Sequence, residues 1–284
     1  MKYAIITPAR NEENFIEKTI LSVVFQTLKP SVWIIVDDAS TDATYRIAKK
    51  YAKKYPWIRV KRRETTSGTE RWSVPEIFME EFRDLKHEFD FIVKLDADVS
   101  LPPDYFERLF EKFKENPSLG IAGGGCYQKE GNEWKLEKAP LSHVRGATKV
   151  YRRKCLEDIG GLVPHLGWDT IDEVKAWMHG WETRSFPEIP FYHHRKSGTR
   201  DGSLKGYIRM AEAAYYMGYF WLFFVFRVCY RVFSPPYLIG ALAMLFTYVN
   251  SYLHEKPLYP EKEVRRFIKK EQVKRLLGRE SLWK

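Results

Sequence analysis

An apolar run passes directly into two carboxylates in Phe91-Ile92-Val93-Lys94-Leu95-Asp96-Ala97-Asp98. A short run of apolar, β-branched and aromatic residues predicts a buried strand from Phe91 to Leu95. Asp96 and Asp98 then stand where that strand ends. In open α/β sheets, ligands bind beyond the carboxyl ends of the strands. This segment therefore predicts both a sheet and the edge of the sheet where chemistry takes place.

The sequence on either side alternates between strand and helix patterns. Runs of β-branched residues predict further strands at Tyr3–Thr7, Trp33–Val36, Ile58–Lys61 and Leu119–Ala122. Helical spacing of apolar residues predicts helices over Glu13–Gln26 and Thr41–Tyr55. Strands that alternate with helices form a parallel sheet with crossover helices. Residues 1–125 therefore predict a doubly wound α/β fold.

Two more polar clusters follow predicted strands. The first strand is followed by Thr7, Pro8, Arg10 and Glu12, and the second by Asp38. If the strands are parallel, these residues converge with Asp96 and Asp98 on one edge of the sheet. Helix capping is the alternative for Asp38, and it is the role expected of Asp42.

From Val144 onward the pattern is mixed. It predicts a strand over Val144–Tyr151, a helix over Arg153–Ile159, a second helix over Asp169–His179 and an extended segment over Thr183–His193. Gly160-Gly161 marks the end of the first of these helices. We therefore expect a mixed-sheet domain over residues 1–205.

The last third of the chain is apolar and aromatic over Ala213–Phe226 and Pro236–Leu253. Each run falls short of, or barely reaches, the ~20 residues needed to span a bilayer. This favours interfacial or re-entrant helices over spanning ones, with ordinary core as the alternative for the aromatic residues. Residues 255–284 add ten Lys or Arg against five Glu, which suits an anionic membrane surface. Residues 206–284 are therefore expected to form membrane-associating helices with a basic tail.

The net charge of +10 suits nucleic acid, an anionic membrane or a phosphorylated substrate. No nucleic-acid-binding motif is recognised, so nucleic acid is not an expected partner. The cysteines Cys126, Cys155 and Cys229 are far apart, and the apolar run Tyr3–Ile6 is too short for a signal peptide. We expect a cytoplasmic protein that is peripheral or shallowly inserted at the inner face of the cell membrane.

Four segments, in this order, resemble family 2 glycosyltransferases of the GT-A fold. They are Ile6-Thr7-Pro8-Ala9-Arg10-Asn11-Glu12-Glu13, Val36-Asp37-Asp38-Ala39-Ser40-Thr41-Asp42, Leu95-Asp96-Ala97-Asp98 and Gly167-Trp168-Asp169-Thr170-Ile171-Asp172-Glu173. The tail resembles a membrane-associated prokaryotic subset. The resemblance implies a metal-dependent hexosyltransferase that moves a sugar from a nucleotide-diphosphate donor to a hydroxyl of a lipid-linked or polysaccharide acceptor. It also implies inversion at the sugar carbon, without a covalent intermediate.

Asp96 and Asp98 suit a hard divalent cation, Mn²⁺ or Mg²⁺, which neutralises charge on a departing diphosphate. The alternative is a pair that caps a loop. The resemblance implies that Asp98 touches the metal and that Asp96 also lies near the sugar or ribose. It offers His193 and His194 as a third ligand or diphosphate contact, for which a surface turn is the alternative.

The resemblance implies donor binding by Thr7, Pro8, Arg10, Glu12 and Asp38. Arg145 is counted with these donor-binding residues. The segment Arg145–Thr148 that it opens is also suited to lining the acceptor pocket, or to forming a bulge.

A hydroxyl acceptor must lose its proton as it attacks, so a carboxylate base is expected. In the family this base lies at a helix start ahead of a Gly-aromatic pair. Asp169 stands eleven residues before Gly180-Trp181, with Trp168 where a Glu is common. Asp172 is the second candidate, and an acidic first turn favoured by the helix dipole is the alternative for both.

Two other functions remain open. A polyprenyl-phosphate sugar synthase has a phosphate acceptor and needs no general base. A non-catalytic GT-A scaffold or sugar-nucleotide sensor needs no metal, and the intact Asp96 and Asp98 argue against it.

Overall fold

The computed structural model describes residues 1–64, 73–85, 88–195 and 203–282. The chain divides into two compact units, Met1–His194 and Arg195–Lys284. The boundary expected from the sequence, between residues 205 and 206, lies farther along the chain.

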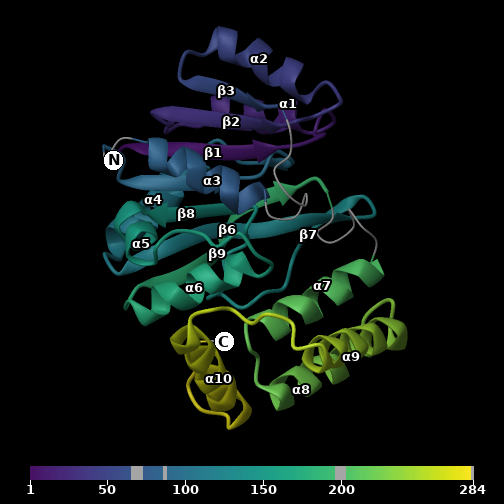
Figure 1. The fold of residues 1–284 in the computed structure, drawn as a ribbon. Helices are drawn as coiled ribbons and strands as arrows, with labels where there is room; N and C mark the ends of the chain where they lie inside the picture. The colour runs from purple at the N-terminus through teal and green to yellow at the C-terminus, as the bar shows by residue number, and fades with distance from the viewer. Residues whose placement is uncertain (65–72, 86–87, 196–202, 283–284) are drawn as a thin grey trace. The chain divides into compact units, whose positions relative to one another are not determined.

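The first unit is built on a mixed β-sheet (Figure 1). Within the described residues its strand order is β3-β2-β1-β4-β8-β6-β9-β5, with β7 paired to β6. The strands β1 to β4 are parallel, whereas β8 runs antiparallel to both of its neighbours, β4 and β6. The strands are β1 (Tyr3–Ala9), β2 (Val32–Asp38), β3 (Ile58–Arg63), β4 (Phe91–Leu95), β5 (Val99–Ser100), β6 (Leu119–Glu130), β7 (Glu133–Leu136), β8 (Thr148–Arg152) and β9 (Glu182–His193). The doubly wound mixed sheet predicted from the sequence is confirmed.

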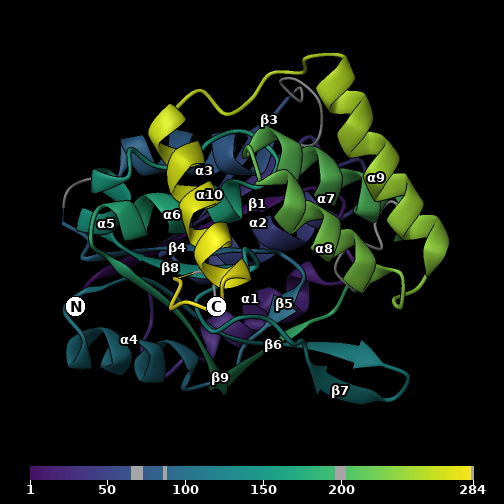
Figure 2. The ribbon, with the colours of Figure 1, turned by 90° about the horizontal axis from the view of Figure 1, so that it is seen from below.

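Helices cover both faces of this sheet (Figures 1 and 2). One face is covered by α1 (Ile16–Val24), α2 (Thr44–Lys54) and α4 (Tyr105–Glu115). The other is covered by α3 (Ser73–Asp84), α5 (Arg153–Asp158) and α6 (Trp168–Met178). Alternate residues of β1 go to the two cores, since Tyr3 and Ile5 pack with the first set and Ala4 and Ile6 with the second. A sheet buried on both faces explains why its central strands are almost continuously apolar.

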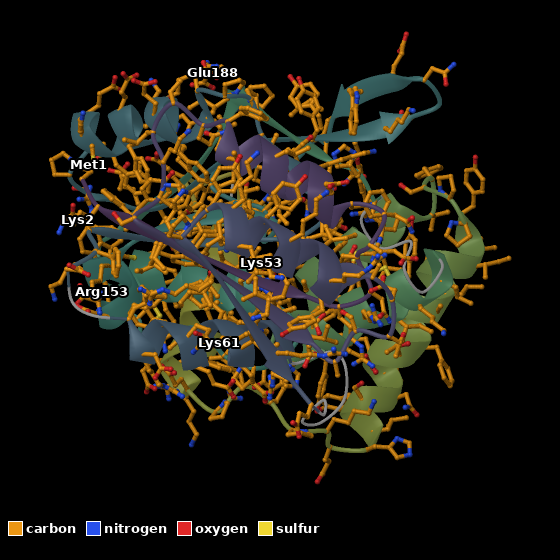
Figure 3. The ribbon with its side chains drawn as sticks, turned by 90° about the horizontal axis from the view of Figure 1, so that it is seen from above. Met1, Lys2, Lys53, Lys61, Arg153 and Glu188 are labelled. Atoms are coloured by element: carbon orange, nitrogen blue, oxygen red, sulfur yellow. The ribbon has the colours of Figure 1, made fainter. Side chains whose placement is uncertain are left out.

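Strand direction fixes which end of the sheet carries the site. At one end, the backbone N–H of Asp90 donates to the Lys2 carbonyl at 2.8 Å, and that of Arg153 donates to the Asp90 carbonyl at 2.9 Å. Figure 3 labels Lys2 and Arg153 on this side of the unit. The opposite end receives the last residues of β1, β2 and β4, which are the residues that the sequence marks for chemistry.

Several element boundaries differ from the sequence prediction. The strand expected from Val144 begins only at Thr148, because the segment before it forms a loop. The strand expected to end at Ala122 continues as β6 to Glu130 and pairs with both β7 and β9. The helices α3 and α4 and the hairpin strand β7 were not anticipated.

Glycine allows the long strand β6 to approach β9 closely. A Cβ atom added at Gly124 would lie 2.1 Å from the carbonyl oxygen of Ile189 and 2.7 Å from the ring of Tyr105. The Tyr105 hydroxyl accepts the Gly124 N–H at 2.9 Å and lies 2.9 Å from the Thr148 hydroxyl. This contact ties α4 to β6 and β8 at the centre of the unit.

Replacing Gly124 by alanine is expected to destabilise the protein by about 1 to 3 kcal/mol, the usual cost of overpacking. The change in unfolding free energy is measured by urea denaturation. The control is Gly131→Asn, at a turn with φ of +63° and nothing near the added atom, where a shift within about 0.5 kcal/mol is expected. Equal shifts for the two variants would contradict the proposed close approach.

The second unit is helical within its described residues. It contains α7 (Ser203–Tyr216), α8 (Trp221–Arg231), α9 (Leu238–Leu253) and α10 (Lys262–Leu276). The apolar segment expected over Ala213–Phe226 is broken at Gly218, which takes a φ of +69° between α7 and α8. Among the described residues, no helix is both long and apolar enough to cross a membrane.

Aromatic contacts hold α7, α8 and α9 together. The rings of Phe224 and Tyr248 stack with centroids 4.0 Å apart and join α8 to α9. A Cβ atom added at Gly240 of α9 would lie 3.2 Å from the ring of Tyr207 on α7. The Tyr207 hydroxyl donates to the Pro235 carbonyl at 2.9 Å. One side of α9 is therefore packed against α7 and α8.

Candidate active site

Three side chains that can ligate a metal come together at the end of β4. Asp96 and Asp98 follow β4, and His193 is the last residue of β9. The pairing of β5 with β9 places Val99 opposite His193 and so brings the two segments together. One ligand atom from each of the three side chains lies within 4.8 Å of the others. Three of the four residues that the sequence predicts as metal ligands therefore lie together.

Positive charge surrounds these carboxylates. The Lys94 ammonium donates to Asp96, and it also donates to the Gly146 carbonyl at 2.6 Å. His193 Nε2 lies 3.3 Å from Asp98 Oδ1. Burial lowers the pKa of His193, but hydrogen bonds to Asp98 and Cys126 outweigh burial and raise that pKa to about 10. Burial raises the pKa of Asp96 above its ordinary value, against the opposing effect of Lys94.

The donor set fits a divalent cation of the Mn²⁺ or Mg²⁺ type. Carboxylate oxygens are the preferred ligands of both ions, and the His193 imidazole adds a nitrogen once a bound metal has displaced its proton. Asp98 is buried, and two carboxylates this close repel each other unless a positive charge lies between them. Lys94 supplies part of that charge, and a bound cation would supply more.

The backbone N–H of His194 donates to the Asp98 carbonyl at 2.9 Å, but its ring is not part of the cluster, which corrects its assignment as a metal ligand. Successive side chains of a strand point to opposite sides, so His193 and His194 diverge at the end of β9. His194 Nε2 lies 3.0 Å from the Ser100 hydroxyl, and its ring stacks on Phe15 at 5.9 Å between centroids.

The loop before β8 links the carboxylate cluster to the start of α6. The Asp96 N–H donates to the Ala147 carbonyl at 2.9 Å. A Cβ atom at the neighbouring Gly146 would lie 3.1 Å from the Trp168 ring and 3.6 Å from the Cβ of Asp169. Asp169, in the first turn of α6 and half-buried, therefore lies beside Gly146, in the loop whose next residue binds the Asp96 N–H.

A buried cluster of charges anchors α6 to the sheet behind Asp169. Lys149 Nζ donates to the Asp169 carbonyl at 2.6 Å and to the two oxygens of Asp172 at 2.8 and 2.9 Å. The Tyr151 hydroxyl donates to Asp172 at 2.5 Å. Glu173 lies 3.1 Å from Lys149 Nζ and accepts the Val144 N–H at 2.7 Å. Lys149, Asp172 and Glu173 are all buried.

This cluster changes the interpretation of Asp172. Its carboxylate is 1% exposed, and both oxygens are engaged by Lys149. Burial raises the pKa of Asp172 to about 6, although Lys149 opposes the shift. A carboxylate enclosed in this way is not open to an acceptor, and this geometry does not favour Asp172 as the second candidate base.

Lys149→Met is expected to destabilise the protein by about 3 to 5 kcal/mol, because it leaves two buried carboxylates without their cation. Thermal or urea unfolding measures the loss. The control is Lys135→Met, which breaks an exposed pair with Glu130 at 3.3 Å and should cost at most about 1 kcal/mol. If Lys149→Met were as stable as the control, the charge cluster would not be the anchor of α6.

Asp38 ends β2 with a buried carboxylate that lacks a hydrogen bond. Neither of its oxygens has a hydrogen-bond partner among the described residues, and its nearest cation is Arg63 Nε at 3.9 Å. Buried polar atoms are nearly always satisfied, so such a carboxylate suits a ligand that donates to it. This is the property expected of a residue that contacts a ribose or base.

The residues after β1 form the other side of this edge. Thr7 is fully buried, and its hydroxyl accepts the Trp33 indole N–H at 2.9 Å. Pro8 is also buried, while Arg10 is half-buried. The Glu12 N–H donates to the Thr44 hydroxyl at 2.7 Å, which ties the loop after β1 to the start of α2.

Arg145 lies in the loop before β8, and its guanidinium pairs with Glu137. The most important residues that the sequence analysis missed are Lys94 and Lys149. Both are lysines inside predicted buried strands, and a charge in such a place is itself a signal, since buried lysines require partners.

Comparison with known proteins identifies the family. Residues 4–168 match the family model described as glycosyl transferase family 2, and the chain belongs to this family.

The most similar curated relatives include a dolichol-phosphate mannosyltransferase of Pyrococcus furiosus, 29% identical over 183 residues. That match covers 64% of this chain and 45% of the relative. A poly(ribitol-phosphate) beta-glucosyltransferase of Bacillus spizizenii is 39% identical over 218 residues, covering 71% of this chain and 33% of the relative. The chain thus spans less than half the length of these relatives.

A solved mannosyltransferase from Pyrobaculum calidifontis, in complex with GDP-Man and Mn²⁺, has the same fold. It is 17% identical, with a TM-score of 0.59 over 98% of this chain and 88% of that chain. The chain therefore has a GT-A-like fold with C-terminal helices.

Proposed function

We propose that this protein transfers a sugar from a nucleotide-diphosphate donor to an acceptor hydroxyl, with inversion at the sugar carbon. The observation that carries the proposal is the cluster of Asp96, Asp98 and His193 at the strand ends, with Asp169 beside Gly146 in the loop that binds the Asp96 N–H. This arrangement offers a place for a metal-bound diphosphate beside a carboxylate that can accept a proton.

The donor would lie along the edge formed by β1, β2 and β4. Asp38 would accept hydrogen bonds from the ribose or base, and the segment from Thr7 to Glu12 would form the floor beneath the nucleotide. Asp96, Asp98 and His193 would hold Mn²⁺ or Mg²⁺, which when bound neutralises charge on the diphosphate.

Asp169 is the proposed general base. It is half-buried at the N-terminus of α6, where its backbone carbonyl is fixed by Lys149. The N-terminus of a helix attracts negative charge, which suits a carboxylate at this position. Removal of the acceptor proton on the face opposite the leaving diphosphate gives an inverted product in a single step.

A second candidate function is suggested by the relative named as a dolichol-phosphate mannosyltransferase. A polyprenyl-phosphate acceptor is already ionised at neutral pH and needs no base. In that case Asp169 would not be required for proton transfer.

The acceptor is proposed to be lipid-linked or a polysaccharide, and the reaction to occur at the cytoplasmic face of a membrane. The names of the two curated relatives support this acceptor class, one with a lipid phosphate and the other with a phosphate polymer.

Asp169→Asn is expected to reduce kcat by about 10²- to 10⁴-fold with a hydroxyl acceptor, the usual contribution of a positioned base. Donor binding should stay within about twofold of wild type, because Asp169 is outside the metal cluster. Glu157→Gln, an exposed substitution on α5, is the control that should leave kcat unchanged. Full activity of Asp169→Asn with a hydroxyl acceptor would contradict the base, and activity confined to a polyprenyl phosphate would favour the second candidate.

A further inference from the structure

Large apolar side chains lie exposed on α8, on α9 and on the turn between them. We call this the α8–α9 surface and define it by Phe226, Tyr230, Phe233, Ile239, Phe246 and Tyr252. All six are at least 59% exposed, and Phe233 is 83% exposed. Single exposed apolar residues are ordinary in soluble proteins, but this many large ones on two packed helices and the turn between them suggest an interaction site.

The α8–α9 surface is one side of packed helices. On α9, the exposed residues Ile239, Leu242, Phe246 and Val249 recur every three or four positions. The residues between them include Ala241 and Met244, which are buried in the contact with α7 and α8. The helix is therefore apolar on its packed side and on its outward side, which is unusual for a helix that faces water.

The charge of this unit favours an anionic partner for the α8–α9 surface. From Ala213 to Leu253 the sequence contains no Asp, Glu or Lys, and its charged residues are Arg227 and Arg231. Residues 195–284 contain 17 Lys or Arg against seven Asp or Glu, whereas residues 1–194 contain 30 of each. The whole net charge of the protein thus belongs to the unit that carries the α8–α9 surface.

The C-terminal helix presents part of this charge. A hollow of about 370 Å³ lies at the end of α10 and the residues that follow it, lined by Lys269, Lys270, Lys274 and Arg279, with Val273 and Leu277 as its apolar residues. Cations beside apolar contacts are suited to lipid phosphates and the upper acyl chain.

The lengths of the helices favour insertion parallel to the membrane plane. The 16 residues of α9 extend roughly 24 Å at 1.5 Å per residue, and the hydrocarbon core is about 30 Å thick. Exposed Trp221, Tyr230 and Tyr252 are residue types that gather where headgroups meet acyl chains.

We propose that the α8–α9 surface inserts into one leaflet of a bilayer that contains anionic phospholipids. A second copy of this chain is a poorer partner, because it would bring together two units that each carry an excess of ten positive charges. This proposal names the surface through which the protein would reach the proposed membrane location. It depends on that location and not on the transfer reaction.

The test is sedimentation of the full chain with vesicles of phosphatidylcholine alone or with 30 mol% phosphatidylglycerol, a composition of about one anionic lipid in three. The wild type is expected to bind the anionic vesicles at least tenfold more tightly, and to lose about this preference in 0.5 M salt as charge is screened. The triple variant Phe233→Ser, Ile239→Ser, Phe246→Ser should lose at least about tenfold in partitioning.

The matched control is Phe25→Ser, which removes an aromatic residue 67% exposed on the first unit and should bind as wild type. Because the three substituted residues are exposed, the triple variant should unfold at the wild-type temperature. Cys229 provides a readout without substitution, since it is exposed on α8 while Cys126 and Cys155 are buried. A polarity-sensitive fluorophore on Cys229 should shift to the blue with anionic vesicles.

Three results would overturn the proposal. They are failure of the wild type to bind anionic vesicles, equal binding by the triple variant, and a wild-type dimer that the triple variant turns into a monomer without any vesicle binding. Because the experiment uses neither donor nor acceptor, its outcome is separate from that of the Asp169 experiment.

Discussion

Asp96 and Asp98, separated by one residue at the end of a buried strand, repel each other. The site is organised around that repulsion. Lys94, inside β4, donates to Asp96, and His193 approaches Asp98 from the end of β9. Both positive groups reach the carboxylates only because β9 pairs with β5 and β4 lies at the centre of the sheet. A divalent cation would take over the compensation from His193, whose ring must lose its proton to bind a metal. The same repulsion explains why the pair stands at the strand ends, where a charged ligand can enter.

A second set of buried charges anchors α6 to the sheet. Lys149, on β8, joins the first turn of α6 to the sheet through the Asp169 carbonyl and through Asp172. Gly146, whose carbonyl accepts from Lys94, packs on Trp168 at the start of the same helix. The cluster of Asp96, Asp98 and His193 and the proposed base are thus positioned by neighbouring strands, β4 and β8, and by the loop that precedes β8. Strands hold such groups more exactly than long loops can.

The sequence was sufficient to predict what depends on local pattern. Apolar runs followed by carboxylates identified the strand ends, and the doubly wound order then placed Asp38, Asp96 and Asp98 on one edge. Sequence could not tell His193 from His194, because that choice depends on where β9 ends and on which side each side chain points. Nor could it show that Asp172 is enclosed, since its partner Lys149 is 23 residues away and meets it only through packing of α6 on β8. The break at Gly218 was missed because apolar composition continues through it.

The central claim is that the cluster of Asp96, Asp98 and His193 binds a metal together with a nucleotide diphosphate. Calorimetric titration with UDP, GDP, dTDP and CDP, each with and without Mn²⁺, tests it most directly on wild type, Asp98→Asn and the control Asp104→Asn, which alters an exposed carboxylate. The account predicts that at least one nucleotide binds only with Mn²⁺, that Asp98→Asn weakens this binding by at least about tenfold, and that the control binds as wild type. Absence of binding by all four nucleotides, or binding indifferent to both Mn²⁺ and Asp98, would contradict it.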